Sequence, residues 1–344
     1  MADGNGGLTI RRPRLGLGER VRRAVGASVV DGFFGGSARS FGALPISHPA
    51  VHGVRVERDL AYGPGGRDHL LDLYRPKRAG REKLPVVFYI HGGGFRILSK
   101  DSHWLFGLAY ARRGFLVVNV NYRLAPRHPF PAAVEDVFLA WQWLLNSADR
   151  LGADLSKVVV AGESAGANLA SVLALAASYR RDEPFARQVF DAGVRPRAVV
   201  AACGLFDVSR IERFSHLVSV HRDRLEEVTD AYLDGVSLDD ARTLELADPL
   251  TVFERGDRPH RPLPSFFLPC GTWDALLDDT RRLHSALQAL GARSRKEEYA
   301  RGPHAFHAFV FTPAARRCWR DTFAFLEDEG LCERAEPSGL LKFL

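Results

Sequence analysis

The chain has 344 residues, of which 46% are hydrophobic and 26% charged, and this composition excludes a disordered or fibrous protein. The net charge of +6 comes from arginines scattered along the chain rather than from a basic stripe with interleaved aromatic residues, so we expect no nucleic-acid partner. Apolar runs of about eighteen residues do not occur, so we expect no stable membrane insertion.

Three segments can be recognised from the order of predicted elements. Residues 1–50 have loosely helical apolar spacing, and we expect them to form an N-terminal cap segment. Strands and helices then alternate over residues 51–205 and 263–330, which predicts an α/β domain with a mostly parallel central sheet and helices on both faces. Residues 206–262 are charge-rich and helical without a clear strand, and we interpret them as a cap insertion at the carboxyl edge of the sheet.

The boundaries of the expected elements follow from apolar periodicity and from the turn residues between them. Strands are predicted over residues 54–61, 70–74, 85–90, 115–121, 157–161, 197–203, 264–269 and 294–299. Helices are predicted over residues 104–113, 131–146, 165–179, 222–232, 279–290 and 313–326.

The most informative motif is Gly162-Glu163-Ser164-Ala165-Gly166, which follows the apolar run 157–161 directly. A strand that breaks into a helix at a serine is the nucleophile elbow, G-x-S-x-G. Its glycines are needed because side chains on either side of the strained serine would collide. The turn exposes the Ser164 hydroxyl and aims the amide of Ala165 at the same point, where it can stabilise an oxyanion.

A second motif, His91-Gly92-Gly93-Gly94-Phe95, follows the strand predicted over 85–90. Three consecutive glycines let the backbone approach a ligand closely and turn its amides toward it. Two of these amides, with that of Ala165, would make a three-donor oxyanion hole.

A serine nucleophile needs a base and an acid that orients the base, and in this fold the chain order is Ser, Asp or Glu, then His. Asp274 stands in the turn after the strand predicted over 264–269, whereas Asp278 and Asp279 suit the start of the next helix. His304 and His307 both lie in the loop after the last predicted strand, and spacing alone leaves the choice between them open.

Together these residues resemble the hormone-sensitive-lipase-like carboxylesterases of the α/β-hydrolase superfamily. The resemblance covers about residues 55–325 and also rests on the segment 122–133 (YRLAPRHPFPAA), on Gly271-Thr272-Trp273-Asp274, and on His304-Ala305-Phe306. It implies an α/β-hydrolase fold with a helical cap, the catalytic domain being residues 51–205 and 263–330. The implied site residues are Ser164 as nucleophile, Asp274 as acid, His304 as base, and the amides of Gly93, Gly94 and Ala165 as the oxyanion hole.

The chain departs from the family pattern at several positions around the expected site. The family commonly has Asp where this chain has Glu163, which is one methylene longer, and it often has Asp where this chain has Asn121. Arg127 replaces a common glutamate, and Ala167 replaces a common glycine. These changes leave the expected catalytic groups in place but alter the charge pattern near them.

From these observations we expect a serine carboxylesterase that acts on short- to medium-chain acyl esters and needs no cofactor or metal. Phe95, Trp104 and Phe306 are candidate walls of a substrate pocket. The alternatives are an acyl hydrolase with the same triad acting on an amide, formamide, carbamate or lactone, and a non-catalytic ligand-binding protein on this fold. His304 argues against the second alternative, because receptors built on this fold have lost that histidine.

Location and assembly rest on weaker signals. The four cysteines at 203, 270, 318 and 332 are widely spaced, which predicts free thiols in a reducing compartment. Residues 1–23 contain no apolar stretch of signal-peptide length, so a cytoplasmic protein is expected. The expected partner is a small-molecule ester. The sequence does not determine the oligomeric state, and the resemblance is compatible with a homodimer because members of the family often pair.

Overall fold

The computed structural model describes residues 44–77, 82–215, 218–237 and 241–333, with isolated positions between 18 and 42. The expected N-terminal cap segment, residues 1–50, lies almost wholly outside the described residues. Two of the isolated positions, Gly26 and Gly42, lie close to side chains of the described part of the chain. A Cβ added at Gly26 would lie 2.9 Å from the Arg224 guanidinium, and one added at Gly42 would lie 3.1 Å from the Trp104 indole nitrogen.

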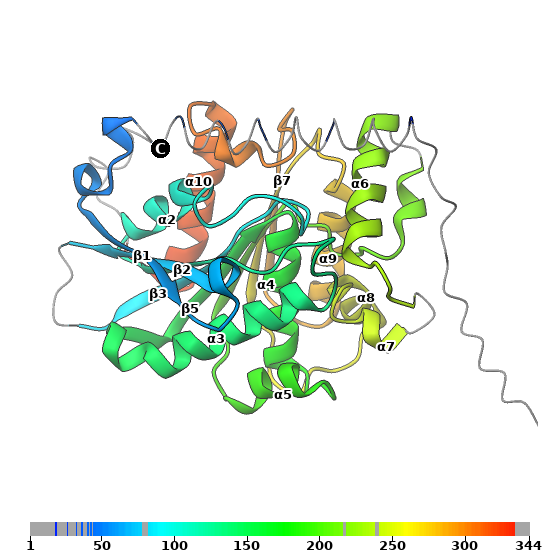
Figure 1. The fold of residues 1–344 in the computed structure, drawn as a ribbon, viewed down its shortest axis with the longest axis horizontal. Helices are drawn as coiled ribbons and strands as arrows, with labels where there is room; N and C mark the ends of the chain where they lie inside the picture. The colour runs from blue at the N-terminus through cyan, green and yellow to red at the C-terminus, as the bar shows by residue number, and fades with distance from the viewer. Residues whose placement is uncertain are drawn as a thin grey trace, which may run out of the picture.

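The fold is built on one central sheet with helices on either side of it (Figure 1). The sheet has eight strands in the order β1-β2-β4-β3-β5-β6-β7-β8. Strands β1 and β2 pair antiparallel, as do β2 and β4, and every other neighbouring pair is parallel. The predicted mostly parallel sheet is therefore confirmed. The strands are β1 (Val54–Ala61), β2 (Leu70–Pro76), β3 (Leu84–Ile90), β4 (Leu116–Val120), β5 (Ala153–Glu163), β6 (Ala198–Ala202), β7 (Ser265–Gly271) and β8 (Ser294–Tyr299).

Helices cover both faces of this sheet, and the pattern of burial in the strands shows why. Every residue of β4 and β6 is buried, as expected for strands with apolar side chains on both faces. Two helices, α2 (Trp104–Ala111) and α10 (Pro313–Asp328), pack on one face in a cluster with Val87, Val117 and Phe267. The other face carries α3 (Ala132–Leu151), α4 (Ala165–Ser178), α5 (Pro184–Asp191), α8 (Pro249–Arg255) and α9 (Leu277–Ala289).

The stretch between β6 and β7 contains the expected insertion and no strand among its described residues. Its elements are the 3₁₀ helix η4 (Ile211–Phe214), α6 (Ser219–Tyr232), α7 (Ala241–Leu244) and α8. Tyr232 of α6 stacks on Phe95, with ring centroids 3.8 Å apart, so α6 lies on the loop that follows β3. The insertion also contributes to the main hydrophobic core, and the predicted boundaries at 205/206 and 262/263 stay a prediction.

The structure adds details that periodicity did not predict. Helix α5 was not expected, and α3 runs to Leu151, five residues beyond its predicted end. Strand β5 begins at Ala153, before the apolar run that predicted it. None of the helices in the described part of the chain combines the length and apolar composition needed to cross a bilayer.

Candidate active site

Ser164 occupies a sharp turn between β5 and α4 at the carboxyl edge of the sheet. Its backbone has φ 55° and ψ −120°, a conformation that non-glycine residues rarely adopt. A Cβ on Gly162 would lie 2.5 Å from the backbone of Gly166, and one on Gly166 would lie 2.1 Å from the carbonyl oxygen of Ile90. Only glycines fit beside the serine, as the elbow motif predicts.

Three of the predicted site residues meet at this turn. The Nε2 atom of His304 lies 3.0 Å from the Ser164 Oγ, and its Nδ1 lies 2.9 Å from Oδ2 of Asp274. The other carboxylate oxygen of Asp274 is 3.1 Å from Nδ1 and also accepts a hydrogen bond from the Leu276 amide. An alcohol, an imidazole and a carboxylate are thus connected in series.

The loops after β7 and β8 bring the acid and the histidine together because the two strands are parallel neighbours. The Thr272 amide donates to the Tyr299 carbonyl at 2.9 Å, and the Trp273 amide donates to the Gly302 carbonyl at 3.0 Å. The Thr272 hydroxyl in turn accepts from the Arg301 amide. These bonds hold the two loops side by side at the point where the side chains meet.

The hydrogen bonds define the protonation of His304. A carboxylate only accepts, so Nδ1 carries the proton and Nε2 presents its lone pair to the serine hydroxyl. Burial alone would lower the pKa of His304, but the Asp274 carboxylate outweighs it and raises that pKa above its ordinary value. The side chain of Asp274 is 0% exposed and that of His304 is 42% exposed, so solvent reaches the imidazole but not the carboxylate.

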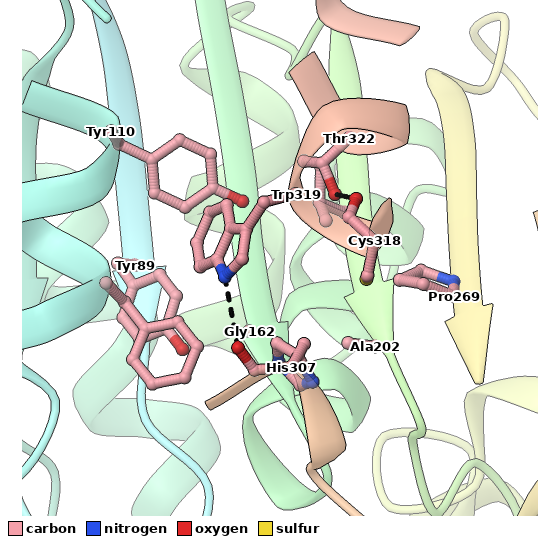
Figure 2. Close-up of a pocket in the computed structure, with 11 residues that line it drawn as sticks. Tyr89, Tyr110, Gly162, Ala202, Pro269, His307, Cys318, Trp319 and Thr322 are labelled. Atoms are coloured by element: carbon pink, nitrogen blue, oxygen red, sulfur yellow. Dashed lines mark hydrogen bonds between the residues drawn. The ribbon is translucent and has the colours of Figure 1, made fainter. Parts of the chain in front are cut away.

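The other histidine of this loop has different surroundings. His307 is buried, and burial lowers its pKa to about 4, which leaves the ring neutral. Its carbonyl accepts from the Trp319 indole, as Figure 2 shows. The structure therefore brings His304, and not His307, to the serine.

The glycine loop after β3 supplies amides without partners. Gly93 has φ 113° and Gly94 has φ 59°, both in the left-handed region that favours glycine. The amides of Gly93, Gly94 and Ala165 donate to no other residue in the described part of the chain. The first amide of the loop differs, because Gly92 donates to a side chain, Glu163.

The three aromatic candidates for a substrate pocket lie in different places. Phe95 is completely buried against Tyr232, and Phe306 is buried against Tyr299. Trp104 is half-buried at the start of α2. In this conformation Phe95 and Phe306 serve the packing of the core, and a substrate would need side-chain movement to touch either.

One small cavity and one open pocket are lined by described residues. A cavity of about 20 Å³ lies behind the elbow strand, between Gly162, His307 and Trp319, and it holds no more than about one water molecule (Figure 2). An open pocket of about 490 Å³ lies between Gly65, Arg123 and Phe185, and its lining does not include Ser164, Asp274 or His304. Neither space identifies the substrate.

Among the described residues, two groups of side chains have the chemistry of metal ligands. Cys203, Asp274 and His304 lie close together, but the carboxylate and imidazole of this group already bond each other. In the second group, of three aspartates, the Lys100 ammonium lies 2.7 Å from Asp59, 2.9 Å from Asp72 and 2.8 Å from Asp101. Lysine thus supplies the positive charge that a metal would bring.

The chain is similar to known α/β hydrolases and esterases. A family model described as alpha/beta hydrolase fold matches residues 87–308. The carboxylesterase NlhH of Mycobacterium tuberculosis is 31% identical over 258 residues, which cover 75% of this chain and 76% of NlhH. Esterase LipQ of the same species is 28% identical over 288 residues, 81% of this chain, and the match spans 64% of the length of LipQ.

Solved structures agree with the family model. The crystal structure of esterase LipW from Mycobacterium marinum matches with a TM-score of 0.70 and 27% identity, covering 92% of this chain and 96% of LipW. The fold, the family model and the carboxylesterase relative agree with the motifs from which the resemblance was first drawn. The chain belongs to the hormone-sensitive-lipase-like carboxylesterase family of the α/β-hydrolase superfamily.

Proposed function

We propose that the protein is a serine carboxylesterase that hydrolyses short- to medium-chain acyl esters through an acyl-enzyme. The observation that carries the proposal is the pair of contacts made by His304, 3.0 Å to the Ser164 hydroxyl and 2.9 Å to the Asp274 carboxylate. A hydroxyl hydrogen-bonded to an oriented imidazole is the arrangement that activates serine as a nucleophile. The names of the relatives support an ester as the substrate.

Acylation begins when the Ser164 oxygen attacks the ester carbonyl carbon and Nε2 of His304 takes the hydroxyl proton. The carbonyl π electrons move onto oxygen, and the amides of Gly93, Gly94 and Ala165 stabilise that oxyanion. The tetrahedral intermediate collapses, the bond to the alkoxy oxygen breaks, and the alcohol leaves with the proton from Nε2. Asp274 stabilises the transient imidazolium and keeps its own negative charge.

Deacylation repeats these steps with water. His304 takes a proton from the water molecule as its oxygen attacks the acyl-enzyme carbonyl. The second tetrahedral intermediate releases the carboxylic acid and returns the proton to Ser164. In both half-reactions the chain itself supplies the nucleophile, the base and the oxyanion donors, and water is the second substrate.

The decisive experiment replaces the nucleophile. Ser164→Ala is expected to lower kcat for p-nitrophenyl butyrate by about a millionfold, because only binding and the oxyanion donors remain. A fluorophosphonate probe should label the wild-type protein and not the variant. A matched control is Ser171→Ala, which removes a buried serine hydroxyl bonded within α4. A Ser164→Ala protein that keeps more than about a tenth of wild-type activity would refute the proposal.

A further inference from the structure

Glu163, the residue before the serine, ends β5 with a buried carboxylate that is in contact with three donors. It is 4% exposed. Its Oε1 accepts from the Gly92 amide at 2.6 Å and from His103 Nε2 at 2.6 Å, and its Oε2 accepts from the Tyr89 hydroxyl. The donors come from the glycine loop, the start of α2 and β3, so one carboxylate ties three segments to the elbow.

The contacts of His103 show that it carries a positive charge. Its Nδ1 lies 2.9 Å from the Ser99 carbonyl oxygen, which can only accept, and 2.9 Å from the Ser102 hydroxyl, whose own proton is donated to that same carbonyl at 2.7 Å. Both neighbours therefore accept, so Nδ1 is protonated. Its Nε2 lies against the Glu163 carboxylate, which also accepts, so Nε2 is protonated as well. Imidazolium and carboxylate therefore form a buried ion pair beneath the glycine loop.

The acid–base properties of the pair agree with this geometry. Burial alone would raise the pKa of Glu163, but His103 and the Tyr89 hydroxyl outweigh it and lower that pKa to about 2. Burial alone would lower the pKa of His103, but the Glu163 charge raises it. The neighbouring rings of His91 and His307 are neutral, with pKa values lowered by burial to about 3 and about 4.

The Glu163 carboxylate fixes the start of the glycine loop. A Cβ on Gly92 would lie 2.6 Å from Oε1, so the carboxylate presses directly on the loop backbone. The carbonyl of the same peptide, that of His91, accepts from the Tyr122 hydroxyl, and the carbonyl of the next peptide, that of Gly92, accepts from His91 Nδ1 at 2.7 Å. The amides of Gly93 and Gly94 lie one and two peptide units further along the chain. The position of the Gly92 peptide therefore sets the orientation of these two amides.

The length of the side chain matters for these contacts. An aspartate at 163 would retract the carboxylate by about one carbon–carbon bond, ~1.5 Å. Two contacts of 2.6 Å, to Gly92 and His103, would then exceed hydrogen-bond distance unless the backbone moved. The additional methylene relative to the common family residue thus lets one carboxylate reach both the loop and His103.

We propose that Glu163, held by His103, is a positioning residue that sets the oxyanion amides of Gly93 and Gly94 against the Ser164 nucleophile. This inference rests on the proposed esterase function. An oxyanion exists in the transition state and not in the bound ester, so misplaced amides lower kcat and leave KM nearly unchanged.

The test compares Glu163→Asp, which keeps the charge but shortens the reach, with Glu163→Gln, which keeps the reach but removes the charge. With p-nitrophenyl butyrate, kcat is expected to fall about a hundredfold in Glu163→Asp and about tenfold in Glu163→Gln, with KM within about threefold. Inhibition by a trifluoromethyl ketone, whose serine adduct carries an oxyanion, should weaken by the same factors. Thermal melting identifies a variant that does not fold. If one of the two Glu163 variants fails to fold, the kcat and KM of the other variant test the proposal.

Glu329→Gln is the matched control. The Glu329 side chain is 8% exposed and accepts from the Ser265 hydroxyl at 2.9 Å at the opposite, amino-terminal end of β7. Loss of the Glu329 charge should lower the melting temperature and leave kcat unchanged.

A double variant that combines a Glu163 substitution with His103→Asn tests whether the two residues act together. Because His103 acts through Glu163, this double variant should lose no more kcat than the worse of its two single variants.

The possible outcomes separate this inference from the proposed function. If folded Glu163 variants keep kcat within threefold of wild type, or raise KM instead, or if the His103 and Glu163 effects on kcat multiply, the positioning role is wrong. If Ser164→Ala stays active or the ketone does not inhibit the wild-type protein, the proposed function itself fails.

Discussion

The Nδ1 atom of His304 lies 2.9 Å from Oδ2 of Asp274, thirty residues earlier in the chain. The carboxylate is completely buried, and its Oδ1 also accepts from the Leu276 amide at 2.9 Å. These contacts fix the position of the carboxylate. The carboxylate in turn holds the imidazole ring of His304 so that Nε2 faces Ser164.

Asp274→Asn is expected to lower kcat by about ten-thousandfold. The Leu276 amide requires an acceptor, so the asparagine oxygen faces it and the NH₂ group faces His304. That donor selects the imidazole tautomer whose Nε2 is protonated and cannot accept the serine proton. Steady-state hydrolysis of p-nitrophenyl butyrate checks this, with the exposed Asp278→Asn as the control that retains activity.

The pH dependence of the same pair provides a second readout. In the proposed mechanism His304 is the base and must be neutral, so kcat/KM of the wild-type protein should fall as the pH drops through its raised pKa. Loss of the Asp274 charge lowers the pKa of the imidazole, so the residual activity of Asp274→Asn should persist to lower pH. Identical acid limbs in the two profiles would contradict the assignment of His304 as the base.

Alanine substitutions at the glycine loop should differ in whether they can be rescued. A Cβ at Gly94 would lie 2.6 Å from a methyl group of Val228, whereas a Cβ at Gly93 would lie 2.1 Å from the backbone carbonyl oxygen of Ile97. An alanine at either position would also have to adopt a positive φ, which adds backbone strain of about 1–2 kcal/mol. We expect kcat of Gly94→Ala to fall at least tenfold and to recover in part with Val228→Ala.

Gly93→Ala provides the comparison for that rescue. Its obstacle is backbone, which cannot be trimmed, so Val228→Ala should leave its kcat unchanged. Equal recovery of the two alanine variants would show that contact with α6 does not limit the loop. Fluorophosphonate labelling rates provide an independent measure of both variants.

Lys100→Met should destabilise the protein by about 3–5 kcal/mol. Its side chain is 1% exposed, and its ammonium lies 2.9 Å from Asp72, whose side chain is completely buried. Burial already raises the pKa of Asp72. Without the lysine, the ion pair left to the Asp72 carboxylate is the one with Arg58, 3.3 Å away, whose side chain is half exposed. Urea unfolding measures the loss, and adding Asp72→Asn should restore part of it.

The control for this prediction is an ion pair in solvent. Lys83 and Asp149 lie 2.7 Å apart with both side chains largely exposed. Lys83→Met should leave the urea midpoint nearly unchanged, because exposed pairs are screened by water and salt. A Lys100→Met protein as stable as wild type would mean that the aspartates adapt without a counterion.

The sequence alone predicted the parallel sheet, the elbow and the glycine loop, because each is a local pattern. A continuous apolar run such as 157–161 predicts a strand covered on both faces, and a Gly-x-Ser-x-Gly directly after it has few local conformations. The helix α5 was missed because it has only eight residues and charged residues interrupt its apolar pattern. The residues 1–50 were predicted as a cap segment, and that prediction stays untested.

Spacing could not choose between His304 and His307, three positions apart in one loop; the contact was decided by the pairing of β7 with β8 and the bonds between their following loops. His103 was not singled out either, since nothing local marks a histidine at a helix start as the partner of a glutamate sixty residues later. Local patterns fix backbone conformation through short-range sterics and periodic burial. Which distant side chains share a proton depends on how the strands are ordered and packed, and only the tertiary structure decides that.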